Sequence, residues 1–398
     1  MRVLLISSCE KGHLNPMVGV AQHLMRAGHY VGWLTIPEPA EQLASLGVEV
    51  VTLRDVPAAP RLVTGGEALA RLVLDAEALR SWIRTLLLDA VPGQVEPVRA
   101  SIRVFRPDVV ALDGMLYQGV IAAHLQGAPT VGVSSALTLL EPPELDFELI
   151  QAVRGLAPQR AALFARYGLD PRFRTCEWLS PLLNVIFATD ALVGMDNVPP
   201  ATHLVGPSLP PDRRGDETEF PWERLREGRP LLYVSFGSQI SWQPELFTIV
   251  AEAAAPLDAQ VVLSAGELAA TGFAHGLPRD VIVCRYVPQL ALLAKAAGFV
   301  CHGGANSVME SMSQGVPMLL LPVCNDQPVQ AHFMRRAGAG LSLDSRALTV
   351  QACRDALREV LDPDGPLRAQ ARRVQASYGR HDGARRAAEL IAGAASMR

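Results

Sequence analysis

The chain has 398 residues, enough for about two domains, and 49% of them are hydrophobic, which is ample material for buried cores. Its formal charge is -4 at pH 7. That balance argues against a nucleic-acid binder and against a protein held on anionic membranes, because both need a basic patch. The six cysteines are scattered without the spacing of metal ligands, so they suit a reducing cytoplasm better than a disulfide scaffold.

The N-terminal stretch "MRVLLISSC" is read as a first strand. Its apolar run is shorter than the ~7–15 residues of a signal-peptide core. No apolar run approaches the ~20 residues that a membrane helix needs. These features predict a cytoplasmic protein without an integral membrane segment.

Short apolar runs alternate with longer helical patterns through the first half of the chain. The runs are continuous and rich in β-branched residues, which is typical of strands buried on both faces of a parallel sheet. Strand–helix alternation predicts a doubly wound sheet. Residues 55–100 and 137–187 read as mostly helical inserts, either lining a ligand pocket or packing on the sheet. The expected strands are residues 2–7, 30–36, 48–53, 108–113, 130–135, 191–195 and 203–207.

Residues 206–230 interrupt this pattern with proline, glycine and charge, which is typical of a linker. A second alternation follows, with strands expected at 231–236, 260–266, 281–287, 298–303 and 317–322. The sequence therefore predicts an α/β protein with two Rossmann-like, doubly wound parallel-sheet domains facing across a cleft. The predicted divisions are a domain over 1–207, a linker over 208–229, a domain over 230–380, and a C-terminal helix over 381–398 that packs back on the first domain.

The stretch "CHGGANSVMESMSQGVP" (301–317) carries the strongest signal for a ligand. Gly303 and Gly304 let the backbone approach a bound group closely. The helix that follows presents free N–H groups and the positive end of its dipole, which suits a phosphate. His302, Asn306 and Ser307 add short hydrogen-bond donors. The plain alternative is a glycine-rich turn with an asparagine cap.

Glu310 lies one helical turn beyond Ser307 and on the same side. A carboxylate there is suited to accept hydrogen bonds from both hydroxyls of a ribose.

Two further stretches fit a nucleotide-sugar site. Asp326 and Gln327 follow a strand and are expected at its carboxyl end, where they would bind neighbouring sugar hydroxyls. Tyr286 offers a ring face for a base, and the backbone from Val287 to Gln289 would meet the edge of the base. Taken alone, Asp326-Gln327-Pro328 would be read as a common turn, and the Tyr286 stretch could equally be a strand that ends at a proline turn.

A candidate base lies near the N-terminus in "CEKGHLNP". Asn15 is predicted to cap a helix that starts at Pro16, which puts His13 in the loop after the first strand. The nearby helix end would favour a neutral imidazole. Asp113 ends the strand 108–113 and is expected beside His13, fixing its tautomer. Alternatively, His13 only caps the helix and Asp113 is a turn residue.

The motifs "YVPQ", "HGGANSVME" and "DQ", in this order, resemble the donor signature of the UDP-glycosyltransferase family, which has the GT-B fold. "LLYVSFGS" (231–238) and "GHLNP" extend the resemblance over nearly the whole chain. It implies inverting transfer of a hexose, best glucose, from a UDP-sugar to a small lipophilic acceptor, with His13 as general base and Asp113 as its partner. The implied donor-binding residues are Gly237, Ser238, Tyr286, Val287, Gln289, His302, Gly303, Gly304, Asn306, Ser307, Glu310, Asp326 and Gln327.

The resemblance implies no metal and no cofactor besides the nucleotide-sugar co-substrate. Asp362-Pro-Asp364 lies in a turn and is read as structural. Glu310 favours UDP over dTDP because a deoxyribose offers one hydroxyl fewer. Plant members place a tryptophan where this chain has Tyr286, so the base contact is less defined than the phosphate site.

Three alternatives stay open: a dTDP-deoxysugar-dependent natural-product glycosyltransferase, a GT-B nucleotide-sugar epimerase, and a non-catalytic protein of the same fold. The sequence does not indicate which acceptor is glycosylated, and it fits a monomer or a homodimer.

Overall fold

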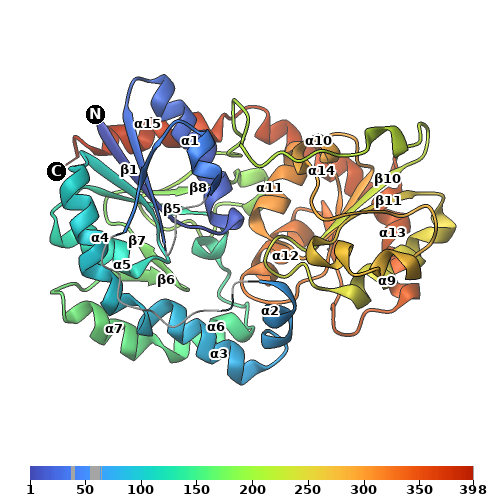
Figure 1. Ribbon diagram of the computed structural model, residues 1–398, viewed down its shortest axis with the longest axis horizontal. Coiled ribbons are helices and arrows are strands. Elements are labelled where there is room, and N and C mark those ends of the chain that lie inside the picture. Colours follow the sequence, from blue (N-terminus) through green and yellow to red (C-terminus); the bar gives the residue numbers. More distant parts are fainter. Residues whose placement is uncertain (37–40, 54–62, 64, 398) are drawn as a thin grey trace.

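The computed structural model describes residues 1–36, 41–53, 63 and 65–397. The chain folds into two lobes, each built around a parallel sheet (Figure 1). Residues 54–62 and 64, at the start of the first expected helical insert, lie outside the described residues.

The first sheet has seven strands in the order β3-β2-β1-β4-β5-β8-β9, all parallel. Alternate residues of β1 enter different cores: Val3 and Leu5 pack on one face, and Leu4 and Ile6 pack on the other. Burial on both faces explains why these strands read as continuous apolar runs. The strands are β1 Arg2–Ser8, β2 Tyr30–Ile36, β3 Glu49–Val51, β4 Val109–Asp113, β5 Thr130–Ser134, β8 Asn184–Ile186 and β9 Thr202–Leu204.

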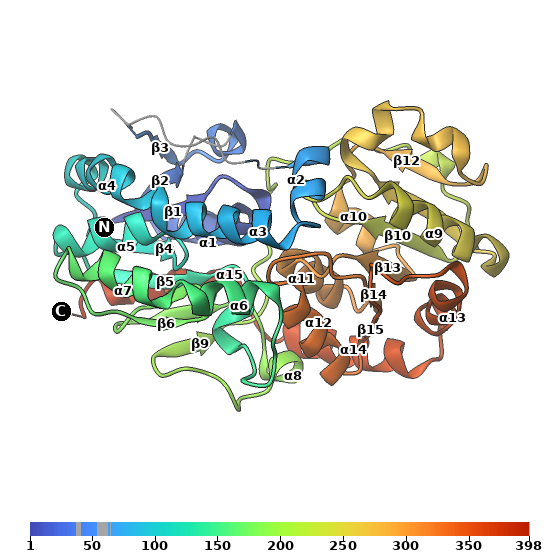
Figure 2. The same ribbon diagram turned by 90° about the horizontal axis from the view of Figure 1, so that it is seen from below.

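Helices cover both faces of this sheet (Figures 1 and 2). A small antiparallel pair, β6 Arg172–Arg174 and β7 Glu177–Leu179, lies beside it. The helices of the first lobe are α1 Lys11–Arg26, α2 Gly66–Leu72, α3 Ala76–Arg84, α4 Val91–Phe105, α5 Tyr117–Leu125, α6 Glu148–Gly155, α7 Ala157–Ala165 and α8 Asp190–Val193, with a π-helical turn at Thr85–Asp89 and 3-10 turns at Glu41–Ser45 and Thr138–Leu140.

One predicted strand is wrong. Residues 191–195 were expected as a strand, but they fall largely within α8, and the strand is β8, inside the insert 137–187 that was expected to be mostly helical. Asn184 accounts for the difference, because its side chain bonds the backbone N–H and C=O of Ser180 and closes a turn before β8. Pairing of β8 with β5 then fixes this short run as a strand.

The second sheet has six parallel strands in the order β12-β11-β10-β13-β14-β15. Its last strand, β15, was not predicted, because three residues that include a glycine give no strand pattern. The strands are β10 Leu231–Ser235, β11 Gln260–Ser264, β12 Ile282–Cys284, β13 Gly298–Cys301, β14 Met318–Leu320 and β15 Gly340–Ser342. The helices are α9 Pro244–Ala254, α10 Gln289–Leu293, α11 Ala305–Ser313, α12 Gln327–Arg336, α13 Val350–Leu361, α14 Pro366–Tyr378 and α15 Gly383–Ala394, with 3-10 turns at Trp222–Arg224, Ala255–Leu257, Gly266–Ala270 and Phe273–Gly276.

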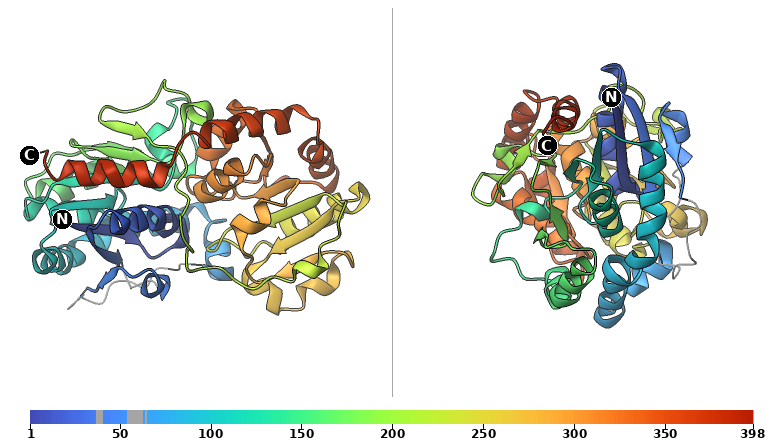
Figure 3. Two further views of the ribbon diagram at one scale, coloured as in Figure 1. Left: turned by 90° about the horizontal axis from the view of Figure 1, so that it is seen from above. Right: turned by 90° about the vertical axis from the view of Figure 1, so that its left-hand side faces the viewer.

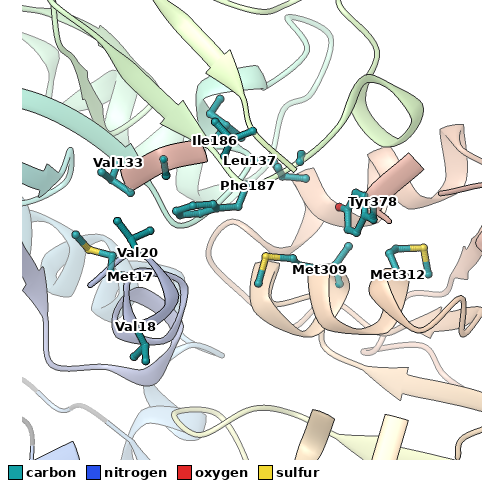
Figure 4. Packing of buried hydrophobic residues seen from close by; sticks show 14 of the residues in the cluster. Met17, Val18, Val20, Val133, Leu137, Ile186, Phe187, Met309, Met312 and Tyr378 are labelled. Carbon is teal, nitrogen blue, oxygen red and sulfur yellow. The ribbon is translucent and has the colours of Figure 1, made fainter. Parts of the chain in front are cut away.

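The two lobes share one buried apolar cluster. Leu137 and Phe187 of the first lobe face Met309 of α11 and Tyr378 of α14 across the interface (Figure 4). The last helix, α15, returns to the first lobe and lies beside α1 (Figure 3). Gly19 permits this approach, since a Cβ there would lie 2.9 Å from the Cβ of Ala384. No helix among the described residues is long and apolar enough to cross a membrane.

Candidate functional site

His13 lies in the first turn of α1, which begins at Lys11. The expected helix start at Pro16 is therefore wrong: Pro16 lies inside the helix, in its second turn. A proline at that position has no N–H to donate to the C=O of Gly12. That carbonyl instead accepts a bond of 3.2 Å from Nδ2 of Asn306, which also donates to the C=O of Lys11 at 3.1 Å. The first turns of α1 and α11 thus meet directly across the two domains.

His13 and Asp113 form the expected pair. Nδ1 of His13 hydrogen-bonds Oδ2 of Asp113, while Oδ1 of Asp113 accepts from the backbone N–H of Met115 at 3.0 Å. The carboxylate is therefore held in place. In the neutral form of His13, a proton on Nδ1 leaves Nε2 as the acceptor nitrogen. Ser135, which the sequence reading missed, places its Oγ 2.8 Å from Nδ1.

The charge state of His13 differs from the expectation of a neutral imidazole. Burial lowers its pKa, but the Asp113 carboxylate outweighs burial and raises the pKa to about 9. Asp326, from the second domain, acts in the same direction. The contact with the Asp113 carboxylate therefore affects the pKa of His13 more strongly than the positive end of α1 does.

A second acid lies behind this pair and was also missed. Glu177 is 2% exposed and accepts hydrogen bonds from the hydroxyls of Ser134 and Thr138. Burial, together with the charge of Asp113, raises the pKa of Glu177 to about 7. Adjacent serines at the end of the strand 130–135 were the available signal for Ser134 and Ser135, whereas Glu177 lay in a run read as helix.

The glycine-rich turn and the start of α11 lie where the sequence placed them. No side chain caps α11, whose N-cap residue is Gly304. His302 packs between two glycines: a Cβ at Gly237 would lie 2.8 Å from its ring, and one at Gly304 would lie 2.5 Å away. Gly237 and Gly303 have φ values of +80° and +88°, which other residues rarely adopt. The structure thus brings these four residues together at an uncapped helix N-terminus.

Burial lowers the pKa of His302 to about 4, so its imidazole is neutral at pH 7 and one ring nitrogen carries a proton to donate. Ser238 follows Gly237 in the turn after β10 and is partly exposed, whereas Ser307 is buried in α11. An uncapped helix end with a neutral donor beside it is suited to bind an anionic group.

Tyr286 is 37% exposed, with Nζ of Lys11 5.2 Å from its ring centroid. Its ring is therefore accessible for stacking, as expected. Val287 is buried next to it. Gln289 turns inward: its Oε1 accepts from the hydroxyl of Tyr233 at 2.9 Å, and its Nε2 donates to Glu310 at 2.8 Å.

Glu310 is not an open carboxylate. It is 2% exposed, and its Oε1 accepts a 2.6 Å bond from Nη1 of Arg214, while its Oε2 accepts from Gln289. Arg214, in the linker, is also bound to Asp216 at 2.6 Å. Arg214 was not predicted from the sequence. Glu310 was expected to accept hydrogen bonds from both hydroxyls of a ribose, and in this structure both of its oxygens are bound to protein groups.

Gln327 also faces away from an open site. Its Oε1 accepts from the backbone N–H groups of Val323 and Cys324, at 2.7 and 3.0 Å. Asp326 hydrogen-bonds Gln330, and burial raises the pKa of Asp326. Of the expected sugar-binding pair, Asp326 lies near His13. Gln327 instead hydrogen-bonds the backbone of its own loop.

Within the described residues, no group of three or more His, Cys, Asp or Glu side chains is arranged to hold a metal. An interdomain cavity of about 20 Å³ is lined by residues of both lobes, among them Ser135 and Asn306.

Known proteins resemble this chain in sequence and in fold. The family model described as UDP-glucoronosyl and UDP-glucosyl transferase matches residues 226–366, which include the glycine-rich turn and α11. The oleandomycin glycosyltransferase of Streptomyces antibioticus is 28% identical over 405 residues, covering 98% of this chain and 90% of its own. The structure of the glycotransferase of kitacinnamycin superposes with a TM-score of 0.78 at 25% identity, covering 99% of this chain and 98% of that one. The chain is thus similar to UDP-glycosyltransferases over residues 226–366, and to full-length bacterial glycosyltransferases over nearly its whole length.

These similarities agree with the fold, since the two parallel-sheet domains are those of the GT-B type. The glycosyltransferase VinC, solved in complex with dTDP, has the same fold, with a TM-score of 0.71 at 22% identity over 100% of both chains. Together, these findings support a glycosyltransferase of the GT-B type.

Proposed function

We propose that this glycosyltransferase moves a hexose, with inversion, from a pyrimidine nucleoside diphosphate sugar to a hydroxyl of a small lipophilic acceptor. One observation carries the proposal: His13, which is paired with Asp113, lies in the turn of α1 that Asn306 binds across the domain boundary. A base and an anion-binding helix N-terminus thus lie within one contact of each other, as transfer from a diphosphate requires.

In the proposed mechanism, Nε2 of His13 takes the proton of the acceptor hydroxyl. The acceptor oxygen then attacks the anomeric carbon from the face opposite the diphosphate, and the bond between that carbon and the phosphate oxygen breaks. Asp113 stabilises the imidazolium that forms. General-base assistance of this kind contributes about 10²–10⁴-fold to the rate.

The leaving diphosphate gains negative charge as it departs. The uncapped N-terminus of α11 and the neutral imidazole of His302 supply preorganised donors for that charge. Ser307, Gly303 and the turn at Gly237 and Ser238 complete this proposed cradle. Because the donors are already in place, we propose that the reaction needs no metal.

UDP-glucose is the first donor to test. The UDP-glucosyl description of the matching family model supports it, and Tyr286 with the backbone from Val287 to Gln289 would receive the uracil. Asp326 would bind sugar hydroxyls, with Gln327 if its side chain is released from its loop.

A dTDP-sugar is the second candidate. The contact between Glu310 and Arg214 favours it, because it removes the argument for a ribose requirement, and the dTDP complex of VinC is consistent with it.

The names of two similar proteins contain natural products, oleandomycin and kitacinnamycin, which bears on the choice of acceptor. We propose an acceptor of that kind, modified in the cytoplasm, and received by the helical segments α3, α6 and α7 of the first lobe.

The test is an assay of the full chain with UDP-glucose and dTDP-glucose against a panel of macrolides and phenols, followed by mass spectrometry. A mass gain of one hexose, with and without EDTA, and a β-linked product by NMR are expected from an α-linked donor. An α-linked product would contradict inversion, and an EDTA-sensitive rate would contradict metal independence.

A further inference from the structure

Arg214 lies in a segment that is hydrogen-bonded to the first lobe, and its side chain reaches Glu310 in the second lobe. The side chain of Gln22 in α1 donates to the C=O of Arg213 at 2.8 Å, and that of Gln42 donates to the C=O of Arg214 at 2.8 Å. Asp212 pairs with Arg26 of α1 at 2.5 Å. The backbone of residues 212–214 therefore follows the first lobe, while the guanidinium of Arg214 reaches the second.

The guanidinium of Arg214 forms a buried ion pair with Glu310. Arg214 is 8% exposed and Glu310 is 2% exposed. Asp216 binds Nε of Arg214 at 2.6 Å, and Nη1 reaches Oε1 of Glu310 at the same distance. Burial lowers the pKa of Arg214, but Glu310 and Asp216 outweigh it and raise the pKa, so the guanidinium stays charged.

Both oxygens of Glu310 are consequently engaged, since Gln289 occupies Oε2. A site discriminates strongly for a hydroxyl only when its polar group would be left unpaired without that hydroxyl. Glu310 would not be left unpaired by a deoxyribose, because Arg214 and Gln289 already satisfy it.

We propose that Arg214 is a specificity-determining residue that makes the donor site tolerant of 2′-deoxyribose. By neutralising and hydrogen-bonding Glu310, it removes the penalty that a nucleotide without a 2′-hydroxyl would otherwise meet. This inference rests on the proposed function, because it assumes that a pyrimidine nucleotide lies beside Tyr286 and Glu310.

The test compares UDP with dUDP, which differ only in the 2′-hydroxyl, by calorimetry on the full chain. This readout needs neither the acceptor nor the sugar. The dissociation constants of the unsubstituted protein are expected to agree within about threefold. In R214Q, Glu310 loses its charged partner, so UDP is expected to bind about ten- to hundredfold more tightly than dUDP, the value of one hydrogen bond to a charged group.

Two further variants separate selectivity from folding. R213Q changes the neighbouring arginine, whose side chain is 86% exposed, and is expected to keep the ratio of the unsubstituted protein. The double variant R214Q/E310Q removes both charges, and its ratio is expected to return to within about threefold because the freed carboxylate is gone.

A preference of the unsubstituted protein for UDP of more than about tenfold would overturn the inference, and that result needs no variant, so it stands even if R214Q fails to fold. An unchanged ratio in folded R214Q would also overturn it. If neither UDP nor dUDP binds any variant or the unsubstituted protein, the proposed function itself fails, which is a different result from a changed selectivity.

Discussion

The side-chain amide of Asn306 donates a hydrogen bond to the backbone carbonyl of Gly12. Pro16 leaves this carbonyl without its usual donor within the helix, because proline has no N–H. A proline in α1 therefore creates the acceptor by which the base-bearing helix is tied to the donor helix α11. In an uninterrupted helix, the N–H at position 16 would hold that carbonyl.

This relationship predicts a coupling between Pro16 and Asn306. P16A restores the N–H, which would compete for the C=O of Gly12, so N306A should cost less stability in the P16A background than in the unsubstituted protein. Urea unfolding of the two single variants and the double variant is expected to give a coupling energy of about 0.5–1.5 kcal/mol. Additive effects would show that the two residues do not share this carbonyl.

The pKa of His13 predicts the pH dependence of transfer. Asp113 raises that pKa to about 9, and a base must be unprotonated to act, so kcat/KM should rise from pH 6 and level off above pH 9. In D113N the charge that raises the pKa is lost. The rise should then move to lower pH, and the plateau should be lower because the imidazolium is no longer stabilised. Initial rates over this pH range measure both, and identical profiles for the two proteins would contradict the assignment.

The raised pKa of Glu177 makes the stability of the protein depend on pH. The sign of this dependence is opposite to that produced by an acid whose pKa is lowered by a salt bridge. Its pKa is raised from 4.5 to about 7, so the folded state holds a proton that the unfolded state releases between these values. Its contribution to the free energy of unfolding therefore falls as pH rises through that window. E177Q keeps the shape but cannot ionise, so it should lose less stability than the unsubstituted protein between pH 5 and pH 8.

Urea unfolding at the two pH values, with the exposed E359Q as control, measures this difference. Equal losses in E177Q and in the unsubstituted protein would contradict the raised pKa of Glu177.

Gly237 and Gly28 form a matched pair of sites, because both have φ of +80°. A Cβ at Gly237 would collide with the ring of His302, whereas a Cβ at Gly28 meets nothing within 4 Å. Both alanine variants should lose about 1–3 kcal/mol of stability through backbone strain. Only G237A should also weaken UDP binding by calorimetry, since only there must His302 move, and equal affinities of the two variants would contradict the proposed phosphate cradle.

The fold was predictable because strands buried on both faces leave continuous apolar runs, and all but one of the expected runs hold a strand. The exception is residues 191–195, which lie largely in α8. The strand that forms instead, β8, depends on a turn closed by the side chain of Asn184 and on pairing with β5, neither of which leaves a periodic pattern. Helix starts were less predictable: Asn15-Pro16 has the composition of a cap, but the helix begins earlier.

The local parts of the candidate site were predictable for the same reason, since His302 to Glu310 is one turn and one helix. Arg214 was not predictable, because its partner Glu310 lies 96 positions away and the linker carries no motif. Ser135 and Glu177 likewise reach the His13–Asp113 pair only through the packing of separate strands.

The most direct test of the central claim is the rate of glucosyl transfer by H13A. Calorimetry first establishes that H13A binds UDP with the affinity of the unsubstituted protein. If His13 is the general base, H13A should bind UDP normally and turn over at least about a hundredfold more slowly. A rate within a few-fold of the unsubstituted protein, at equal UDP affinity, would contradict the account.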